Sequence, residues 1–264
     1  MENESLIRLS VFLGLFALLA LIEAKIPRRP LSESKSKRWI NNWGLVLLNT
    51  GTLKLVALVI PLLAVGAALD ASAKGWGLFN ILALPLWLEV VLAMLILDFL
   101  IWGQHLITHK IPLLWRLHQV HHADIDMDVT TAIRFHPIEI ALSMLLKIGA
   151  VYLLGASALA VILFEIILNG SAMFNHANIK LPLPLDRKIR LLLVTPDMHR
   201  VHHSVHRAEH DSNYGFSLSI WDRMFGTYIA QPAEGHDDMA IGLRWQDTRP
   251  ARLTWNLLLP FRNK

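Results

Sequence analysis

Long apolar runs separated by short polar connectors make up most of the first 170 residues. Three runs are long enough for a membrane-spanning helix, which needs roughly 20 apolar residues; they cover residues 6–24, 43–69 and 81–102. A fourth run, residues 138–170, is too long for one ordinary span and short for two. Because Gly155 lies near its middle, we predict a hairpin that enters the membrane and returns. The pattern predicts an all-α integral membrane protein with about three spans plus this hairpin.

The composition supports a membrane protein. The chain is 54% hydrophobic and 17% charged, with a mean hydropathy of +0.43, whereas a soluble domain is usually about a quarter charged. There is no cysteine, which excludes disulfides, thiolate metal sites and iron–sulfur clusters. The net charge of +4 is modest and forms no basic stripe along the chain. We therefore expect no nucleic-acid partner.

Charge placement predicts the orientation in the membrane. The connector 25–38 carries six basic residues against Glu33 alone, and basic loops stay in the cytoplasm. Glu2 and Glu4 precede the first run in place of a basic cluster, and no A-x-A site follows it. We therefore expect a retained span and not a cleaved signal peptide. The predicted location is the bacterial cytoplasmic membrane or the endoplasmic reticulum.

Three tight histidine clusters interrupt this apolar chain. They read "HLITH", "HQVHH" and "HRVHH" and contain His105, His109, His118, His121, His122, His199, His202 and His203. Positions i, i+3 and i+4 share one face of a helix, so each cluster presents its rings together. Thr195, Pro196 and Asp197 form a helix start before the third cluster. If residues 138–170 turn back, all three clusters lie on the cytoplasmic side of the membrane.

Clustered imidazoles indicate metal binding. Neutral imidazole suits zinc, copper, iron and nickel, and a closed zinc site needs about four ligands. Eight histidines are too many for one ion and suit two. The clusters contain no Glu-x-x-His pair of the carboxylate di-iron bundles, and the chain contains no HEXXH motif.

These motifs resemble the fatty acid hydroxylase/sterol desaturase superfamily of integral membrane enzymes. The matching stretches are "DFLIWGQHLITH", "LLWRLHQVHHADIDMDVTTAIRFHP", "FNHANI" and "TPDMHRVHHS…DSNYGFSLSIWDRMFGTY", in the family's order and over half of the chain. The resemblance implies a transmembrane helical core, a cytosolic helical cap that carries the histidine boxes, a histidine-bound di-iron centre, and O2-dependent oxidation of a lipid.

The resemblance also implies the ligand set. The eight clustered histidines fall on the box positions, and His176 in "FNHANI" matches a further ligand. Some relatives carry another histidine four residues later, where this chain has Lys180. A water held by Asn175 or Asn178 could fill that coordination position.

Several other residues are candidates for supporting roles. Asp98 lies seven residues before His105 on nearly the same helix face, so we expect it to orient a ligating imidazole from the second coordination shell. Weaker candidates for the same role are Asp124, Asp197, Asp211 and Asp222. His136 is either a ligand or a hydrogen-bonded loop residue. We expect His206, His210 and His236 at the surface, while Lys147 and Glu165 either pair or reach toward the interface.

The predicted function is hydroxylation of a membrane lipid, with desaturation as the alternative outcome at the same site. The lipid can be a fatty acyl chain, a sterol-like molecule or a polar lipid. A Gly-rich nucleotide motif and cysteine are both absent, so electrons come from a separate reductase, ferredoxin or cytochrome. The rivals are a membrane haem-binding electron carrier, which needs single opposed histidines, and a metal transporter, which needs ligands near the midplane.

The predicted organisation has three parts. Residues 1–97 form an N-terminal transmembrane region, residues 98–230 form the di-iron domain including hairpin 138–170, and residues 231–264 form a C-terminal tail.

Overall fold

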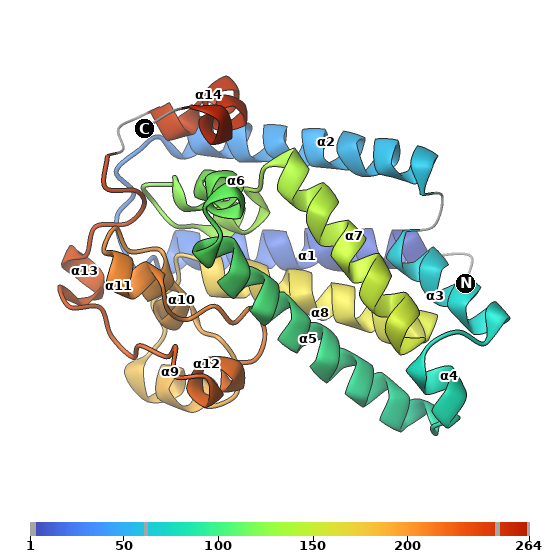
Figure 1. Cartoon of the computed structure of the whole chain (residues 1–264). Helices are drawn as coiled ribbons and strands as arrows, with labels where there is room; N and C mark the ends of the chain where they lie inside the picture. Colours follow the sequence, from blue (N-terminus) through green and yellow to red (C-terminus); the bar gives the residue numbers. More distant parts are fainter. Residues whose placement is uncertain (1–3, 61–62, 246–248, 263–264) are drawn as a thin grey trace.

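The computed structural model describes residues 4–60, 63–245 and 249–262. Long helices lie side by side, and short helices and loops gather at one end of them (Figure 1). The long-helix region contains α1 (Glu4–Lys25), α2 (Lys35–Val59), α3 (Ala64–Lys74), α4 (Leu78–Leu82), α5 (Leu86–Lys110), α7 (Pro137–Leu154) and α8 (Ala158–His176). Within the described residues, β pairing is limited to three isolated bridges. The predicted all-α class is confirmed.

The short elements at one end form what we call the cap, namely residues 111–136, 177–245 and 249–262. Its elements are α6 (Pro112–His122), η1 (Val129–Ile133), α9 (Leu183–Ile189), α10 (Pro196–His202), α11 (Arg207–His210), α12 (Ile220–Met224), α13 (Gly235–Asp238), η2 (Arg249–Ala251), α14 (Leu253–Leu258) and η3 (Leu259–Phe261). The loop between α3 and α4 lies at the opposite end of the long helices (Figure 1).

Five stretches are long and apolar enough to cross a membrane: α1, residues Lys35–Leu82, α5, α7 and α8. The run predicted at 43–69 is not one helix, because α2 ends at Val59 and α3 begins at Ala64; Pro61, which lies between them, falls outside the described residues. The run predicted at 81–102 begins later, after Pro85, and continues to Lys110. Proline suits the start of a helix because its φ is fixed and it donates no hydrogen bond there.

The fourth run forms the predicted helical hairpin. Gly155 closes α7 in the left-handed conformation (φ 65°), and the Ser157 side chain accepts a hydrogen bond from the Ala160 amide at the start of α8. The hairpin is longer than predicted because α8 continues to His176. Each of its helices is therefore long enough to cross the membrane, and both cap-side ends lie at the histidine clusters.

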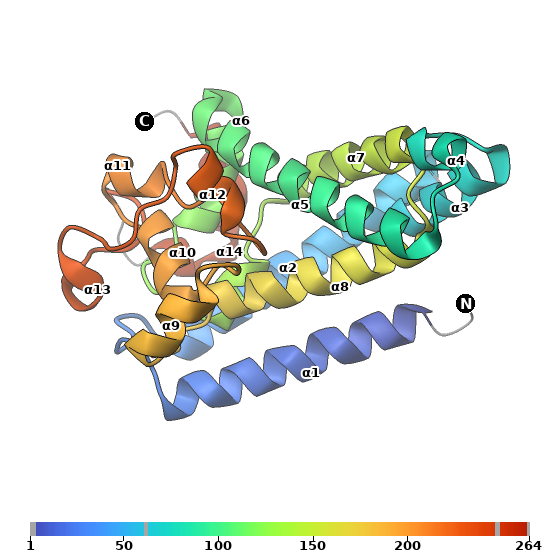
Figure 2. The same cartoon turned by 90° about the horizontal axis from the view of Figure 1, so that it is seen from below.

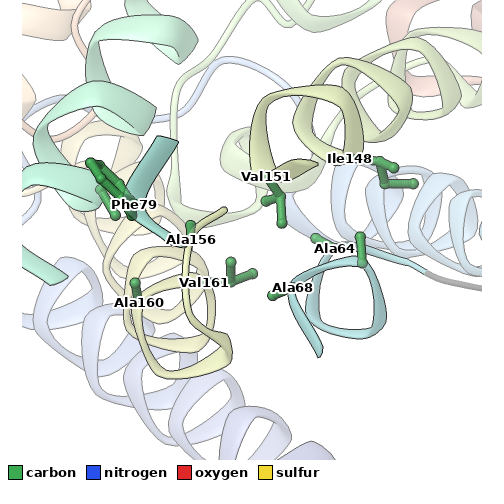
Figure 3. Packing of buried hydrophobic residues seen from close by; sticks show 10 residues of the cluster. Ala64, Ala68, Phe79, Ile148, Val151, Ala156, Ala160 and Val161 are labelled. Carbon is green, nitrogen blue, oxygen red and sulfur yellow. The ribbon is translucent and has the colours of Figure 1, made fainter. Parts of the chain in front are cut away.

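Small residues hold the helices together at the end far from the cap. Ala64 and Ala68 of α3 face Val151 of α7 and Val161 of α8 (Figure 3). Beside this cluster, a Cβ added to Gly77 would lie 2.1 Å from the Gly155 backbone nitrogen. The two loops therefore touch through backbone atoms. In the second view, α1 runs along the outer side of α8, which it contacts (Figure 2).

Residues 249–262, which belong to the predicted C-terminal tail, pack into the cap. Asn256 is completely buried, accepts a hydrogen bond from Arg134 at 2.6 Å and donates one to Asn41 at 2.9 Å. Arg134 also donates to Asn42 of α2. The chain end is thus tied to α2 and to the loop that follows α6.

Candidate metal centre

The three predicted histidine clusters meet where the long helices join the cap. α5 contributes His105 and His109, α6 contributes the second cluster, α8 contributes His176, and α10 with its C-terminal cap residue contributes the third. α10 begins as predicted, with Pro196 in its first turn and the Thr195 hydroxyl accepting a hydrogen bond from the Met198 amide. All nine histidines are buried.

The nine side chains form two adjacent groups. One contains His105, His109, His118, His122 and His202, and the other contains His121, His176, His199 and His203. Within each group, every residue offers a ligand atom within 4.8 Å of the others. The ring centroids of His122 and His203, one from each group, lie 4.6 Å apart. The structure therefore brings together every histidine predicted as a ligand, in an arrangement that suits two neighbouring ions.

Main-chain carbonyls fix the orientation of four of these rings. The Nδ1 atoms of His105, His121, His176 and His202 lie 2.7, 3.3, 2.7 and 2.6 Å from the carbonyl oxygens of Tyr214, Arg134, Ala172 and Ser212, respectively. A carbonyl only accepts hydrogen bonds, so each Nδ1 carries the proton and donates it. The Nε2 atom of each ring is then unprotonated, and its lone pair is available to a metal ion.

The Nε2 lone pairs of neighbouring rings point at one another. Such an arrangement is repulsive by itself and is favourable when a cation lies between the rings. His121 Nε2 lies 3.1 Å from His176 Nε2, and both rings are protonated on Nδ1, so two lone pairs face each other without a proton between them. His105 Nε2 lies 3.1 Å from His118 Nε2 in the same way, since the Nδ1 atom of His118 donates to Glu139 Oε1. Two nitrogens about 2.1 Å from one ion would be separated by about 3 Å at a right-angled ligand arrangement. A shared cation therefore relieves the repulsion.

Other ring nitrogens in the same place also lack partners. Among the described residues, both nitrogens of His109, His122 and His203 are buried without a hydrogen-bond partner. Buried polar atoms are normally satisfied, and leaving one unpaired costs about 1–3 kcal/mol. The donor set fits bound metal ions, which would occupy these positions.

The electrostatic environment keeps the cap histidines neutral. Burial, followed by the neighbouring histidines, lowers the pKa well below its usual value for each of His121, His122, His199, His202 and His203. A neutral imidazole has a lone pair available for a metal ion, whereas a protonated one does not.

Among the described residues, Glu139 and not Asp98 is the acid that hydrogen-bonds a cluster histidine. Glu139 Oε1 lies 2.6 Å from His118 Nδ1. Asp98 instead accepts hydrogen bonds from the Trp221 indole at 2.8 Å and from the Leu218 amide at 3.3 Å. The expected contact of Asp98 with an imidazole is absent from the described residues, because the cap segment that follows Tyr214 offers it two donors.

Of the four weaker acidic candidates, two support the metal centre and two pair with arginines. Asp211 Oδ1 lies 3.5 Å from His109 Nδ1, next to the centre. Asp222 accepts hydrogen bonds from the Tyr214 and Gly215 amides and from the Trp102 indole, so it shapes the loop whose carbonyl holds His105. Asp124 binds Arg38 through two contacts of 2.8 Å, and Asp197 pairs with Arg200.

The remaining histidines lie outside the two groups. His136 caps α7 by accepting a hydrogen bond from the Ile138 amide, which favours its interpretation as a loop residue. His206 is half-exposed beside Glu234, as expected of a surface residue. The prediction for His236 was wrong, because that side chain is buried 3.8 Å from Asp197. His210 is mostly covered, stacks on Trp115, and could form a small group with His109 and Asp211.

The positions near His176 also differ from the expected pattern. Asn178 exchanges hydrogen bonds with the Arg29 backbone, and Lys180 is exposed. Asn175 donates to the Phe216 carbonyl, and its Oδ1 atom is buried without a partner among the described residues. Of the two asparagines predicted to hold a water, only Asn175 retains a free oxygen.

A cavity of about 170 Å³ adjoins the centre, and His105 and His118 are among the residues that line it. Most of its other lining residues, among them Lys147, belong to α5, α7 and α8. Glu139, Ser143 and Lys147 follow one another at intervals of four residues, so they form one polar stripe on α7. The Gln104 amide oxygen accepts a hydrogen bond from the Ser143 hydroxyl at 3.2 Å across the cavity wall. Lys147 donates a hydrogen bond to Glu165 at 2.6 Å, so these two residues pair with each other, which is one of the two predicted alternatives.

Comparison with known proteins agrees with the chemistry of the site. The family described as Fatty acid hydroxylase matches residues 90–227. Ornithine lipid hydroxylase OlsE from Rhizobium tropici is 29% identical over 235 residues, which are 88% of this chain and 70% of that protein. Alkylglycerol monooxygenase from Xenopus tropicalis is 32% identical over 139 residues, which are 51% of this chain and 29% of that protein. The human alkylglycerol monooxygenase is 31% identical over 144 residues, 53% of this chain and 30% of that protein.

The chain thus spans less than a third of the length of these two alkylglycerol monooxygenases. No solved structure gives a significant match. The family match covers more than half of the chain and includes all nine clustered histidines, and the relatives are hydroxylases and monooxygenases. This chain is therefore an oxygenase of the fatty acid hydroxylase family.

Proposed function

We propose that the chain is a non-haem di-iron monooxygenase that hydroxylates a polar lipid of its own membrane on the cytoplasmic side. The observation that carries this proposal is the pair of adjacent, buried histidine groups, which contain five and four residues. Imidazole sites accept several divalent metals, and the family resemblance favours iron over the others.

The metal pair, when bound, supplies the reductive activation of O2 that is needed to break an unactivated C–H bond. The chain supplies the rest. Main-chain carbonyls hold the Nδ1 protons, burial keeps the imidazoles neutral, and the closed cap excludes water from the centre. Hydroxylation consumes one lipid C–H bond, one O2, two electrons and two protons, and yields one alcohol and one water. The chain has no cysteine for an iron–sulfur cluster, so a separate electron donor is part of the proposal.

The cavity beside His105 and His118 favours a polar lipid over a bare hydrocarbon. Its wall contains the Gln104–Ser143 pair and Glu139, whose Oε2 atom is buried without a hydrogen-bond partner among the described residues. A substrate that placed only methylene groups against this wall would leave its polar atoms without hydrogen-bond partners, which costs free energy. The relatives, an ornithine lipid hydroxylase and alkylglycerol monooxygenases, also favour a polar lipid.

Lipid mass spectrometry under ¹⁸O2 tests this function. Cells that express the parent chain should accumulate a lipid that is heavier by one labelled oxygen atom, and cells that express His121→Ala or His202→Ala should not. Both variants should still insert into the membrane, because the apolar helices drive insertion. A lipid lacking two hydrogens would identify a desaturase, and unchanged lipids in the presence of a competent electron donor would contradict the proposal.

A further inference from the structure

A group of apolar side chains is exposed on the cap, outside the five stretches that can cross the membrane. We call it the apolar flank. Its large hydrophobic residues are 40–68% exposed, and they are Leu183, Leu185, Leu191, Leu192, Leu193, Ile220, Met224 and Phe225. They come from α9, from the residues that follow it, and from α12 with its C-cap residue Phe225, all at the cap end of the long helices (Figure 1). Large apolar side chains that gather on one part of a surface typically mark a site that contacts a membrane or a partner.

The apolar flank is held in place by hydrogen bonds. The Ser219 amide donates to the Leu192 carbonyl and the Val194 amide donates to the Ser217 carbonyl, both at 2.9 Å. The Ser219 hydroxyl donates to the Arg190 carbonyl at 2.8 Å. These bonds join the segment after α9 to the residues that precede α12. The leucines are therefore exposed by a fixed framework.

The apolar flank is continuous with the membrane-spanning helix α5. The Phe225 ring stacks on Trp102 and Phe99 of α5, with centroids 4.7 and 5.6 Å apart. The Trp221 ring lies 5.0 Å from that of Phe99. Phe99 is itself partly exposed within an apolar span. The apolar flank therefore adjoins the apolar stretch of α5 that contains Phe99 and Trp102.

The exposed charges of the apolar flank have one sign. Arg187, Lys188 and Arg223 are exposed, whereas Asp186 and Asp222 are buried. Leucine and aromatic residues surrounded by Lys and Arg are typical of elements that lie in the plane of a bilayer surface. There the cations reach the lipid phosphates while the apolar side chains enter the acyl region.

We propose that the apolar flank is embedded in the boundary between head groups and acyl chains of the leaflet that faces the cap. The continuity with α5 and the purely basic exposed charge favour a lipid surface over a second protein. This placement seats the cap on the bilayer beside the metal centre, since Trp102 precedes His105 by one helical turn. The proposal holds for any reaction that the centre carries out.

Single-cysteine labelling tests the proposal directly, because the natural chain has no cysteine. Leu192→Cys and Met224→Cys would each carry an environment-sensitive fluorophore in phosphatidylcholine/phosphatidylglycerol vesicles. Arg207→Cys on α11 is the matched control, since its side chain is 81% exposed elsewhere on the cap. Nitroxides placed high on the acyl chains should quench positions 192 and 224 several-fold more than position 207, and aqueous iodide should show the reverse order.

Two results would overturn the proposal. If iodide quenched positions 192 and 224 as strongly as position 207, the apolar flank would be in water. If neither quencher reached those two positions, a protein surface would cover them instead of lipid. The fluorescence readout does not depend on turnover, so it stays informative whether or not the chain hydroxylates a lipid.

Discussion

Glu139 both contacts a candidate ligand and lines the adjoining cavity, since its Oε1 atom lies 2.6 Å from His118 Nδ1 while its Oε2 atom is buried without a hydrogen-bond partner among the described residues. Loss of a carboxylate that orients a ligand typically costs 10–100-fold in metal affinity or activity. We expect that loss for Glu139→Gln, which keeps an acceptor without the charge, and a larger one for Glu139→Leu. Metal content and turnover of purified protein would be measured together.

Glu89→Gln provides the matched control for this prediction. Glu89 is also a buried acid in a membrane helix, but it accepts a hydrogen bond from the Ser157 amide near the turn of the hairpin. Its substitution should leave the metal content unchanged. Equal metal loss in both variants would show that any buried carboxylate in the spans disturbs the centre.

His236 predicts a pH effect away from the two metal groups. Burial lowers its pKa to about 4, although Asp197 opposes the shift. The unfolded chain, with a histidine pKa near 6.5, takes up the proton first. Stability is therefore lost as the pH falls from 6.5 toward 4, by about 2 kcal/mol at pH 5. Thermal unfolding would be measured at pH 7 and pH 5. The unfolding temperature of His236→Gln should fall less between the two than that of the parent. His206→Gln at the surface is the control and should show the same fall as the parent.

The residue scale also shows what sequence spacing can and cannot predict. The eight histidines of the three clusters can be identified from the sequence because ligand spacing is local to a helix turn, whereas His176 is identified only by its match to the family pattern. The partners of those histidines cannot be identified in this way, because carbonyls such as Tyr214 O and Ser212 O approach only after the cap folds. Asp98 shares a helix face with His105, yet its side chain binds the Trp221 indole. A shared helix face therefore does not determine whether the Asp98 carboxylate binds the His105 imidazole or the Trp221 indole.

At the scale of elements, the two loops far from the cap depend on glycine. Gly77 has φ 96°, and a Cβ there would lie 2.1 Å from the Gly155 nitrogen and 2.6 Å from the Tyr152 carbonyl. Gly77→Ala should therefore separate the α3–α4 loop from the hairpin and lower the thermal stability by several degrees or more. Gly149→Ala, in the middle of α7 where a Cβ meets nothing within 4 Å, should be neutral or stabilising. Similar unfolding temperatures for the two variants would contradict this close packing.

Helix ends were harder to predict than helix existence. Hydropathy located every long helix, but it merged α2 with part of α3, whose apolar composition continues across the break. It also ended α5 at Trp102, because the two turns that follow carry polar residues and the histidines. Those turns are helical in the structure because the cap packs around them and supplies partners to the imidazoles.

At the scale of the whole molecule, the charge distribution predicts the topology. The basic connector before α2 lies at the cap end of the helices, while the α3–α4 loop lies at the other end (Figure 1). A reporter fused after Lys264 should therefore be cytoplasmic, and one inserted next to Gly75 should be on the opposite side. The same location for both reporters would be incompatible with a bundle that crosses the membrane.

The facing lone pairs of the centre also bear on the lifetime of the protein in the cell. The nine histidines extend from position 105 to position 203, so the set is complete only after about 100 further residues have been synthesised. Membrane insertion needs only the apolar helices, whereas closing the cap brings these lone pairs face to face, and bound cations would relieve their repulsion. If the centre holds iron, as proposed, newly made chains in iron-starved cells would be inserted yet remain open to proteases. Pulse–chase labelling should then show an unchanged rate of synthesis with a shorter half-life, and metal supply would control abundance as well as activity.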